Sequence, residues 1–203
     1  MAHGEDVTEF GGYFIVNGIE RLIRLLIAPR RNHAVALVRP SFQKRGPTYS
    51  DKGVQMRCVR PDQSSQTITL HYCSDGLVTL RFSYSKQEYM VPLILILKAL
   101  RPASDRELFE SITQTKTTST LPTDTFLTDR VELLLRSFKK FNLYSQDQCL
   151  AFLGSKFAVM LDSPEDDSDI AVGSDFLRSV ICVHLDPFRE KFDILMYASV
   201  LFF

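Results

Sequence analysis

The chain has 203 residues, 45% of them hydrophobic and 11% aromatic, and its 24 basic side chains balance 24 acidic ones. This length and composition exclude wholesale disorder and indicate one domain, or one and a fraction, with a substantial core. The longest apolar run, residues 91–97, is far shorter than the roughly 20 residues that span a bilayer, and the acidic N-terminus lacks the apolar segment of a signal peptide, so we expect an intracellular protein without membrane contact.

The first predicted elements are a short strand and a turn. In the stretch GGYFIVNGIER, the apolar run 13–16 is followed by Asn17-Gly18, a pair typical of a tight turn. The two glycines before this strand lack the third glycine and the Lys-Ser/Thr of a phosphate-binding loop. Residues 19–27 fit either a helix or a buried strand, and Pro29 ends both. A further strand is predicted over residues 33–39.

Three runs of alternating apolar and polar residues follow, at 54–58, 67–72 and 78–84. Such alternation is typical of strands with one buried and one solvated face, as in an antiparallel meander. Asp-Gly between the second and third runs predicts a hairpin. His71 falls at a polar position, near Arg81 across this hairpin, and we interpret it as a surface histidine and not as a general base.

The second half of the sequence predicts helices. Pro92 suits the first turn of a helix over residues 93–100. Two capping boxes, in which Ser and Glu or Gln side chains satisfy the first backbone N–H groups, mark helix starts at Ser104 and Ser145, and Ser163 begins a looser version. Two apolar stripes have helical spacing: Leu127, Val131, Leu134, Leu135 and Phe138, then Leu150, Leu153 and Phe157.

Together these elements predict an α+β fold, in which a small antiparallel sheet or meander precedes a helical subdomain. The Thr- and Ser-rich residues 113–125 indicate a flexible link. The acidic run at 165–169 lacks the Gly and the terminal Glu of a calcium loop, which favours a solvated loop or a helix start.

No arrangement of residues indicates catalysis. The four cysteines and four histidines are scattered, without a spacing that suits zinc. We expect free thiols, and Cys58 and Cys73 fall in strands, where cysteine packs as a small hydrophobe. Because no nucleophile is tied to a base, we expect no catalytic residue, no metal and no cofactor in this chain.

Charge is unevenly distributed along the chain. Residues 20–60 carry ten basic and two acidic side chains, a net +8, whereas residues 101–203 carry 11 basic and 16 acidic ones, a net −5. The basic side chains that cluster in turns are Arg30, Arg31, Arg39, Lys44 and Arg45. Because loops can bring cations to phosphate without disturbing a sheet, these five are candidates for contacts with a DNA backbone. An ordinary solvated surface explains the same pattern, and both interpretations stay open.

The opening stretch carries a resemblance. GGYFIVNGIER resembles a G-G-Y/V-F-I-(I/V)-N-G-x-E-(K/R)-V segment of the second-largest subunits of multisubunit DNA-directed RNA polymerases, and RPSFQKRGPTYSDKGVQMRCVR resembles the RNA polymerase I version. VPLILILKAL and SQDQCLAFLGSKF are similar to later segments of the lobe of that subunit, so the resemblance runs from residue 11 to about 192. The residues assigned to the opening family motif are Gly11, Gly12, Phe14, Asn17, Gly18 and Glu20.

The resemblance implies a non-catalytic lobe fragment, part of a nucleotidyltransferase whose active site lies outside this segment. Residues 1–32 would end a protrusion-like segment, 33–197 would form the lobe, mainly β to residue 90 and mainly α from 91, and 198–203 would be an atypical apolar tail. The implied role is to shape the DNA cleft during rRNA gene transcription. The implied partners are the largest subunit, lobe-docking subunits of RNA polymerase I and the DNA backbone, and the implied location is the nucleus, at the nucleolus.

Other functions stay open beside this one. A free-standing truncated paralogue would act as a nucleic-acid-binding or regulatory competitor for polymerase partners. A self-contained enzyme is the weakest alternative, because no constellation of residues supports it. Family members are many times longer, so we expect a fragment or a truncated product. Residues 198–203 are apolar where the family continues with a basic helix, and a splice or gene-model artefact is one explanation of this tail, whose origin stays open.

Overall fold

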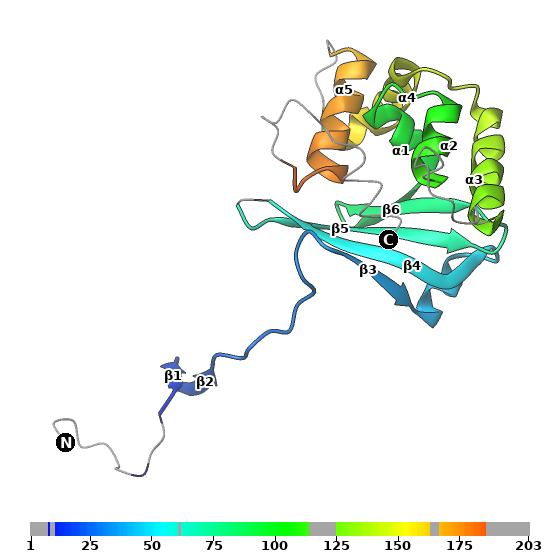
Figure 1. Cartoon of the computed structure of the whole chain (residues 1–203). Coiled ribbons are helices and arrows are strands. Elements are labelled where there is room, and N and C mark those ends of the chain that lie inside the picture. The colour runs from blue at the N-terminus through cyan, green and yellow to red at the C-terminus, as the bar shows by residue number, and fades with distance from the viewer. Residues whose placement is uncertain (1–7, 9–10, 61, 114–124, 163–166, 186–203) are drawn as a thin grey trace.

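The computed structural model describes residue 8 and residues 11–60, 62–113, 125–162 and 167–185. Within them, a five-stranded antiparallel sheet carries helices on one face, and a two-stranded hairpin lies on an N-terminal arm (Figure 1). The predicted α+β class is confirmed. No helix in these ranges is both long and apolar enough to cross a membrane.

The sheet is the predicted meander. Each strand is antiparallel to the next, and the strands are adjacent in sequence order. They are β3 (Ala34–Val38), β4 (Tyr49–Val59), β5 (Ser65–Cys73), β6 (Val78–Tyr84) and β7 (Gln87–Pro92). The turn between β5 and β6 contains Gly76, whose φ of +82° suits glycine. The three alternating runs correspond to β4, β5 and β6, and the strand predicted over residues 33–39 corresponds to β3, whereas no strand is predicted at β7.

Both predicted capping boxes are present in the helical half. Ser104 donates its N–H to Glu107 Oε2 at 2.9 Å, and Ser145 accepts from the Gln148 N–H at 3.2 Å. The helices are α1 (Leu93–Leu100), α2 (Asp105–Thr113), α3 (Thr125–Phe138), α4 (Gln146–Leu161) and α5 (Asp169–Phe176), with short turns η2 (Lys139–Phe141) and η3 (Leu177–Ile181). The predictions at residues 114–124 and 163–166 lie outside the described residues, and α5 begins after Ser168, which caps it.

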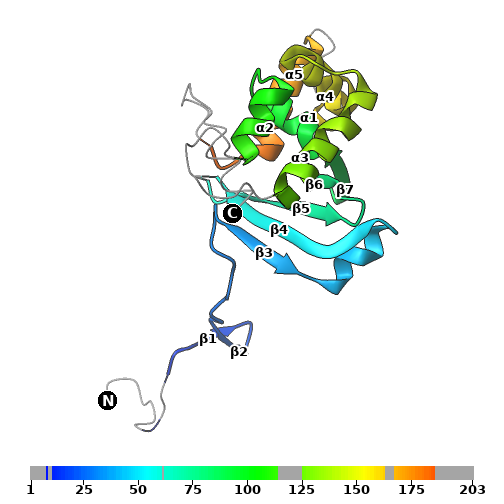
Figure 2. The ribbon, with the colours of Figure 1, turned by 45° about the vertical axis from the view of Figure 1, so that its right-hand side comes forward.

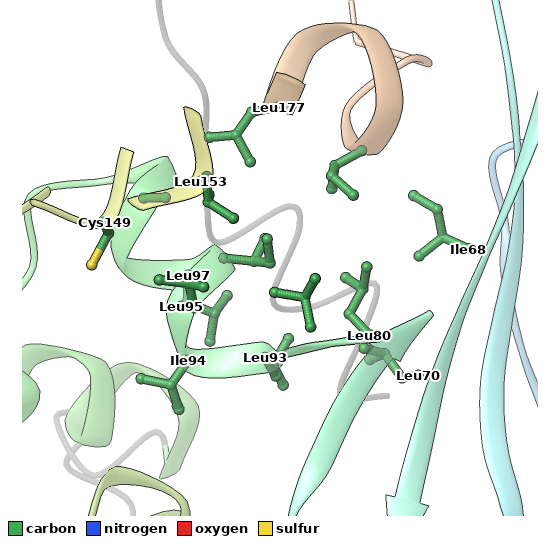
Figure 3. Close-up of a cluster of buried hydrophobic side chains, with 14 of the residues drawn as sticks. Ile68, Leu70, Leu80, Leu93, Ile94, Leu95, Leu97, Cys149, Leu153 and Leu177 are labelled. Atoms are coloured by element: carbon green, nitrogen blue, oxygen red, sulfur yellow. The ribbon is translucent and has the colours of Figure 1, made fainter. Parts of the chain in front are cut away.

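The core lies between the sheet and the helices. Figure 3 shows side chains of β5 and β6, among them Ile68 and Leu80, pointing toward α1, with Leu153 of α4 and Leu177 of η3 beyond it. Seven of the eight α1 residues are buried, because a helix that is apolar at every position but Lys98 is stable only when it is surrounded by other elements. Both predicted stripes on α3 and α4 face this core, with Leu127 half-buried and the other members buried.

The N-terminal arm stands apart from this body in both ribbon views (Figures 1 and 2). It holds the hairpin of β1 (Tyr13–Val16) and β2 (Ile19–Leu22), and the predicted turn is confirmed because Asn17 and Gly18 have φ of +54° and +75°. A helix over residues 19–27 is wrong, and so is a buried strand: β2 is exposed at all four positions. The residues between β2 and Pro29 form no regular element.

Candidate nucleic-acid interface

The five candidate cations form two groups, one before and one after β3. Arg30 and Arg31 precede the strand, while Arg39 follows it and Lys44 and Arg45 end η1 (Pro40–Arg45), the 3₁₀ turn between β3 and β4. With a rise of 3.2–3.4 Å per extended residue, the two groups lie about 25 Å apart along the edge of the sheet. The structure therefore does not gather all five at one point.

The first group lies where the arm joins the body. Asn32 fixes this junction: its Oδ1 accepts from the Val59 N–H at 2.7 Å. The Arg31 side chain donates to Gln63 Oε1 at 3.2 Å. The Arg31 backbone pairs with that of Arg57 of β4 in an isolated parallel β-bridge. Arg31, Arg57, Gln63 and Val59 line a shallow cleft of about 240 Å³ with Pro29. No acidic residue lines this cleft, so it favours an anion.

Arg57 is a candidate that sequence reasoning missed. It lies on the polar positions of β4, and the sequence alone counts it only as part of the +8 segment. Its proximity to Arg31 depends on where the arm meets β4, which is a tertiary contact. The only signal in the sequence is its polar place in the alternating run 54–58.

The second group is split between free and paired cations. Arg39 and Lys44 are exposed, and neither has an ion pair within the described ranges. Arg45 instead stacks over the Phe42 ring at 5.3 Å and lies 3.6 Å from Glu88, with only 19% of its side chain exposed. The same Glu88 accepts from Arg81, and these bonds lower the pKa of Glu88. Arg45 is therefore largely neutralised by the sheet.

His71 lies beneath this second group, and its interpretation as a surface histidine is wrong. Its ring is fully buried and packs edge-on against Phe42 at 4.6 Å and Tyr49 at 5.7 Å. The polar face of the sheet is covered here because η1 folds back over Gly53, whose missing side chain leaves room for Phe42. Burial, with the charges of Arg45 and Arg81, lowers the pKa of His71 to about 4. A neutral histidine adds no charge to the site.

The family-motif residues occupy the arm. Gly11 and Gly12 have φ of +65° and +82°, and Asn17-Gly18 forms the hairpin turn. Glu20 faces Ile15 across the hairpin, and Phe14 is 55% exposed. These residues shape the arm, and among the described contacts none of them joins the arm motif to either cation group.

The described residues contain no group of three or more His, Cys, Asp or Glu side chains that would hold a metal. All four cysteines are free and buried, and burial raises the pKa of the Cys58 thiol to about 12, which keeps it protonated and unreactive. What the arrangement can do is attract phosphate at exposed guanidinium and ammonium groups.

Comparison with known proteins gives one consistent result. The family described as RNA polymerase Rpb2, domain 2, matches residues 30–198. The chain is 55% identical over 200 residues to the DNA-directed RNA polymerase I subunit RPA2 of Eremothecium gossypii and 52% identical over 201 residues to subunit RPA135 of Saccharomyces cerevisiae, each time over 97% of this chain and 16% of the relative. It is 39% identical to human RPA2, over 96% of this chain and 17% of that protein. The chain thus spans about a sixth of the length of these relatives.

Proposed function

We propose a function for this chain from the premise that it belongs to the family RNA polymerase Rpb2, domain 2. The chain serves as a non-catalytic lobe in the second-largest subunit of RNA polymerase I, where it shapes the DNA cleft, contacts DNA backbone and docks other subunits during rRNA gene transcription. Its place is the nucleus, at the nucleolus. The family match over residues 30–198 carries this proposal. Nucleotide addition would occur elsewhere in the polymerase, with no cofactor held by this segment.

The DNA contact is proposed to be made by cations at both ends of β3. Arg30, Arg31, Arg39 and Lys44 are exposed and unmatched by carboxylates within the described ranges, whereas Arg45 is occupied by Glu88. Few aromatic side chains accompany them, which argues against stacking on bases. Such a surface holds phosphates without reading sequence.

Salt dependence of DNA binding tests this contact. We would measure binding of the full chain to two duplexes of unrelated sequence by fluorescence anisotropy, between about 50 and 200 mM salt. Four phosphate contacts predict a slope of log K against log salt of about −3.6, the same for both duplexes. Two double variants should each make the slope less negative by the equivalent of about two phosphate contacts: Arg30→Glu with Arg31→Glu, and Arg39→Glu with Lys44→Glu. The control Arg106→Glu, on α2, should leave the slope unchanged. A flat slope in the unaltered chain would remove DNA from the proposal.

Association with polymerase tests the rest. An antibody against residues of α4 should detect a species that co-fractionates with RNA polymerase I in nuclear extract. Signal confined to a free product near 23 kDa, the mass of this chain, would instead support the free-standing competitor. That alternative is not favoured, because the similarity to polymerase subunits extends over 97% of the chain.

A further inference from the structure

A groove between β3 and α3 is not used by the proposed DNA contact. Its volume is about 430 Å³, and it lies on the helix-covered side of the sheet, at the β3 edge. Strand residues form its floor and α3 its wall. Its apolar lining includes Ala36, Val38, Val54, Leu70, Phe126 and Leu127. Such an unfilled apolar groove next to a sheet edge can accept side chains of a bound segment.

The β3 edge beside the groove offers backbone hydrogen bonds. Within the described ranges β3 pairs only with β4. The Arg39 N–H donates to the Asp51 carbonyl at 2.7 Å. Because backbone groups alternate in direction along an antiparallel strand, Ala34, Ala36 and Val38 turn their N–H and C=O groups away from β4. An exposed row of this kind accepts another extended chain.

The charges around the groove indicate what kind of segment fits. The charged residues that line it are Lys52 and Arg130, both cations, and no carboxylate lines it. The Lys52 side chain is 66% exposed, and its one ion-pair partner among the described residues is the adjacent Asp51, 3.4 Å away. The Arg130 guanidinium lies over the Phe126 ring at 4.9 Å, which holds it at the rim. A ligand with carboxylates complements this rim.

We propose that this groove binds an extended segment of another protein chain, which adds a strand to β3 and directs both apolar and acidic side chains toward the groove. Alternate side chains of a strand point to opposite faces, so every second residue of the segment faces the groove. Among these residues, the apolar ones would fill the groove and the acidic ones would meet Lys52 and Arg130 at its rim, while the backbone pairs with Ala36 and Val38. The proposal rests on the proposed function in that it specifies the docking role of the lobe.

Occupants from this chain itself fit less well. A second copy paired edge to edge would bring its own Lys52 and Arg130 toward the same cations, since the two rims are identical. The arm of residues 19–31 is apolar but carries Arg21, Arg24, Arg30 and Arg31 against a single Glu20. Both arrangements place like charges together, which disfavours them.

A charge-swap experiment tests the groove. The probe is a fluorescein-labelled peptide in which every second residue is Thr and the positions between are Val and Glu in turn, so that Val and Glu share one face of the strand. Its counterpart has Lys in place of Glu. We expect saturable binding of the Glu peptide to the full chain and roughly tenfold weaker binding of the Lys peptide. Arg130→Glu should weaken the Glu peptide roughly tenfold and strengthen the Lys peptide, whereas Arg136→Glu, on the same helix but outside the groove, should change neither.

Strand addition has its own readout. Val38→Pro removes an outward N–H without removing a bond to β4, so it should weaken the Glu peptide roughly fivefold while leaving the far-UV circular dichroism unchanged. Amide exchange at Ala36 and Val38 should slow when the peptide binds. The proposal is overturned by no saturable binding at millimolar peptide, by equal affinity for both peptides, or by dimerisation of the chain that Val38→Pro abolishes. None of these results depends on DNA, so failure here leaves the salt-slope test of the proposed function untouched.

Discussion

Replacing Asp105 with Asn should destabilise the fold well beyond an ordinary surface substitution, because it removes the partner of a buried cation. Lys98 of α1 lies in the family segment VPLILILKAL, and only 5% of its side chain is exposed. Its Nζ is 2.6 Å from Asp105 Oδ1 at the start of α2, and it lies over the Phe138 ring at 5.3 Å. The pair therefore ties α1 to the first turn of α2.

The magnitude follows from how much of the pair is buried. Removing one partner of a buried ion pair costs about 3–5 kcal/mol, because the remaining charge stays in a low-dielectric site. The Asp105 side chain is 38% exposed, so water screens one side of the pair. The Phe138 ring also keeps part of its attraction for the ammonium. We therefore expect a loss of about 2–3 kcal/mol in the free energy of unfolding.

Urea unfolding of the full chain, followed by circular dichroism, measures this loss. Lys98→Met should cost less than about 1 kcal/mol, because an apolar side chain of similar length needs no partner. Adding Asp105→Asn to Lys98→Met should then cost far less than Asp105→Asn alone. Glu132→Gln is the control, since it breaks the exposed pair with Arg136 on α3 and should cost under about 0.5 kcal/mol. Equal losses for Asp105→Asn and Glu132→Gln would refute the reasoning.

Three further predictions concern other features of the fold. Because the folded pKa of His71 is lowered to about 4, its contribution to stability is complete above about pH 6.5 and is lost as the pH falls toward 4; urea midpoints of His71→Phe should lack this part of the acid dependence. A Cβ on Gly154 would lie 1.9 Å from a backbone oxygen of α5, and one on Gly173 would lie 2.1 Å from a backbone oxygen of α4. Alanine at either position should therefore lower the free energy of unfolding by about 1–3 kcal/mol, measured by thermal unfolding, whereas Ser155→Ala should lower it by less than about 0.5 kcal/mol. Ser145→Ala should cost about 1 kcal/mol by the same assay, through loss of the α4 cap.

The elements that the sequence predicts well are those with local causes. Asn17-Gly18 requires two positive φ angles, which few other pairs adopt easily, and the hairpin follows. The Ser145 and Gln148 capping box is complete within four residues, and it marks the helix start that the structure has. The alternating runs predict the meander because sequential antiparallel strands need only short turns.

The features that the sequence could not predict depend on contacts between distant segments. The alternation assigns His71 to the polar face, but it cannot indicate that η1 covers that face through Phe42 and Gly53. Likewise, Arg45 has the same local signals as Lys44, and only the approach of Glu88 from β7 distinguishes a paired cation from a free one. A count of charges in a segment therefore overstates the cations that are available to a ligand.

The two proposed ligands share β3, which couples them. The cation groups flank the strand and the groove lies along it, so an acidic segment would place carboxylates within about 12 Å of either group. That separation is close to the Debye length of about 10 Å at 0.1 M salt, so the effect is modest and fades with salt. Saturating Glu peptide should weaken DNA binding about two- to threefold at low salt, and by linkage DNA should weaken the peptide by the same factor. Anisotropy of labelled DNA with and without peptide measures this, with the Lys peptide as control; tighter DNA binding in the presence of the Glu peptide would show that the two ligands do not meet along β3 as proposed.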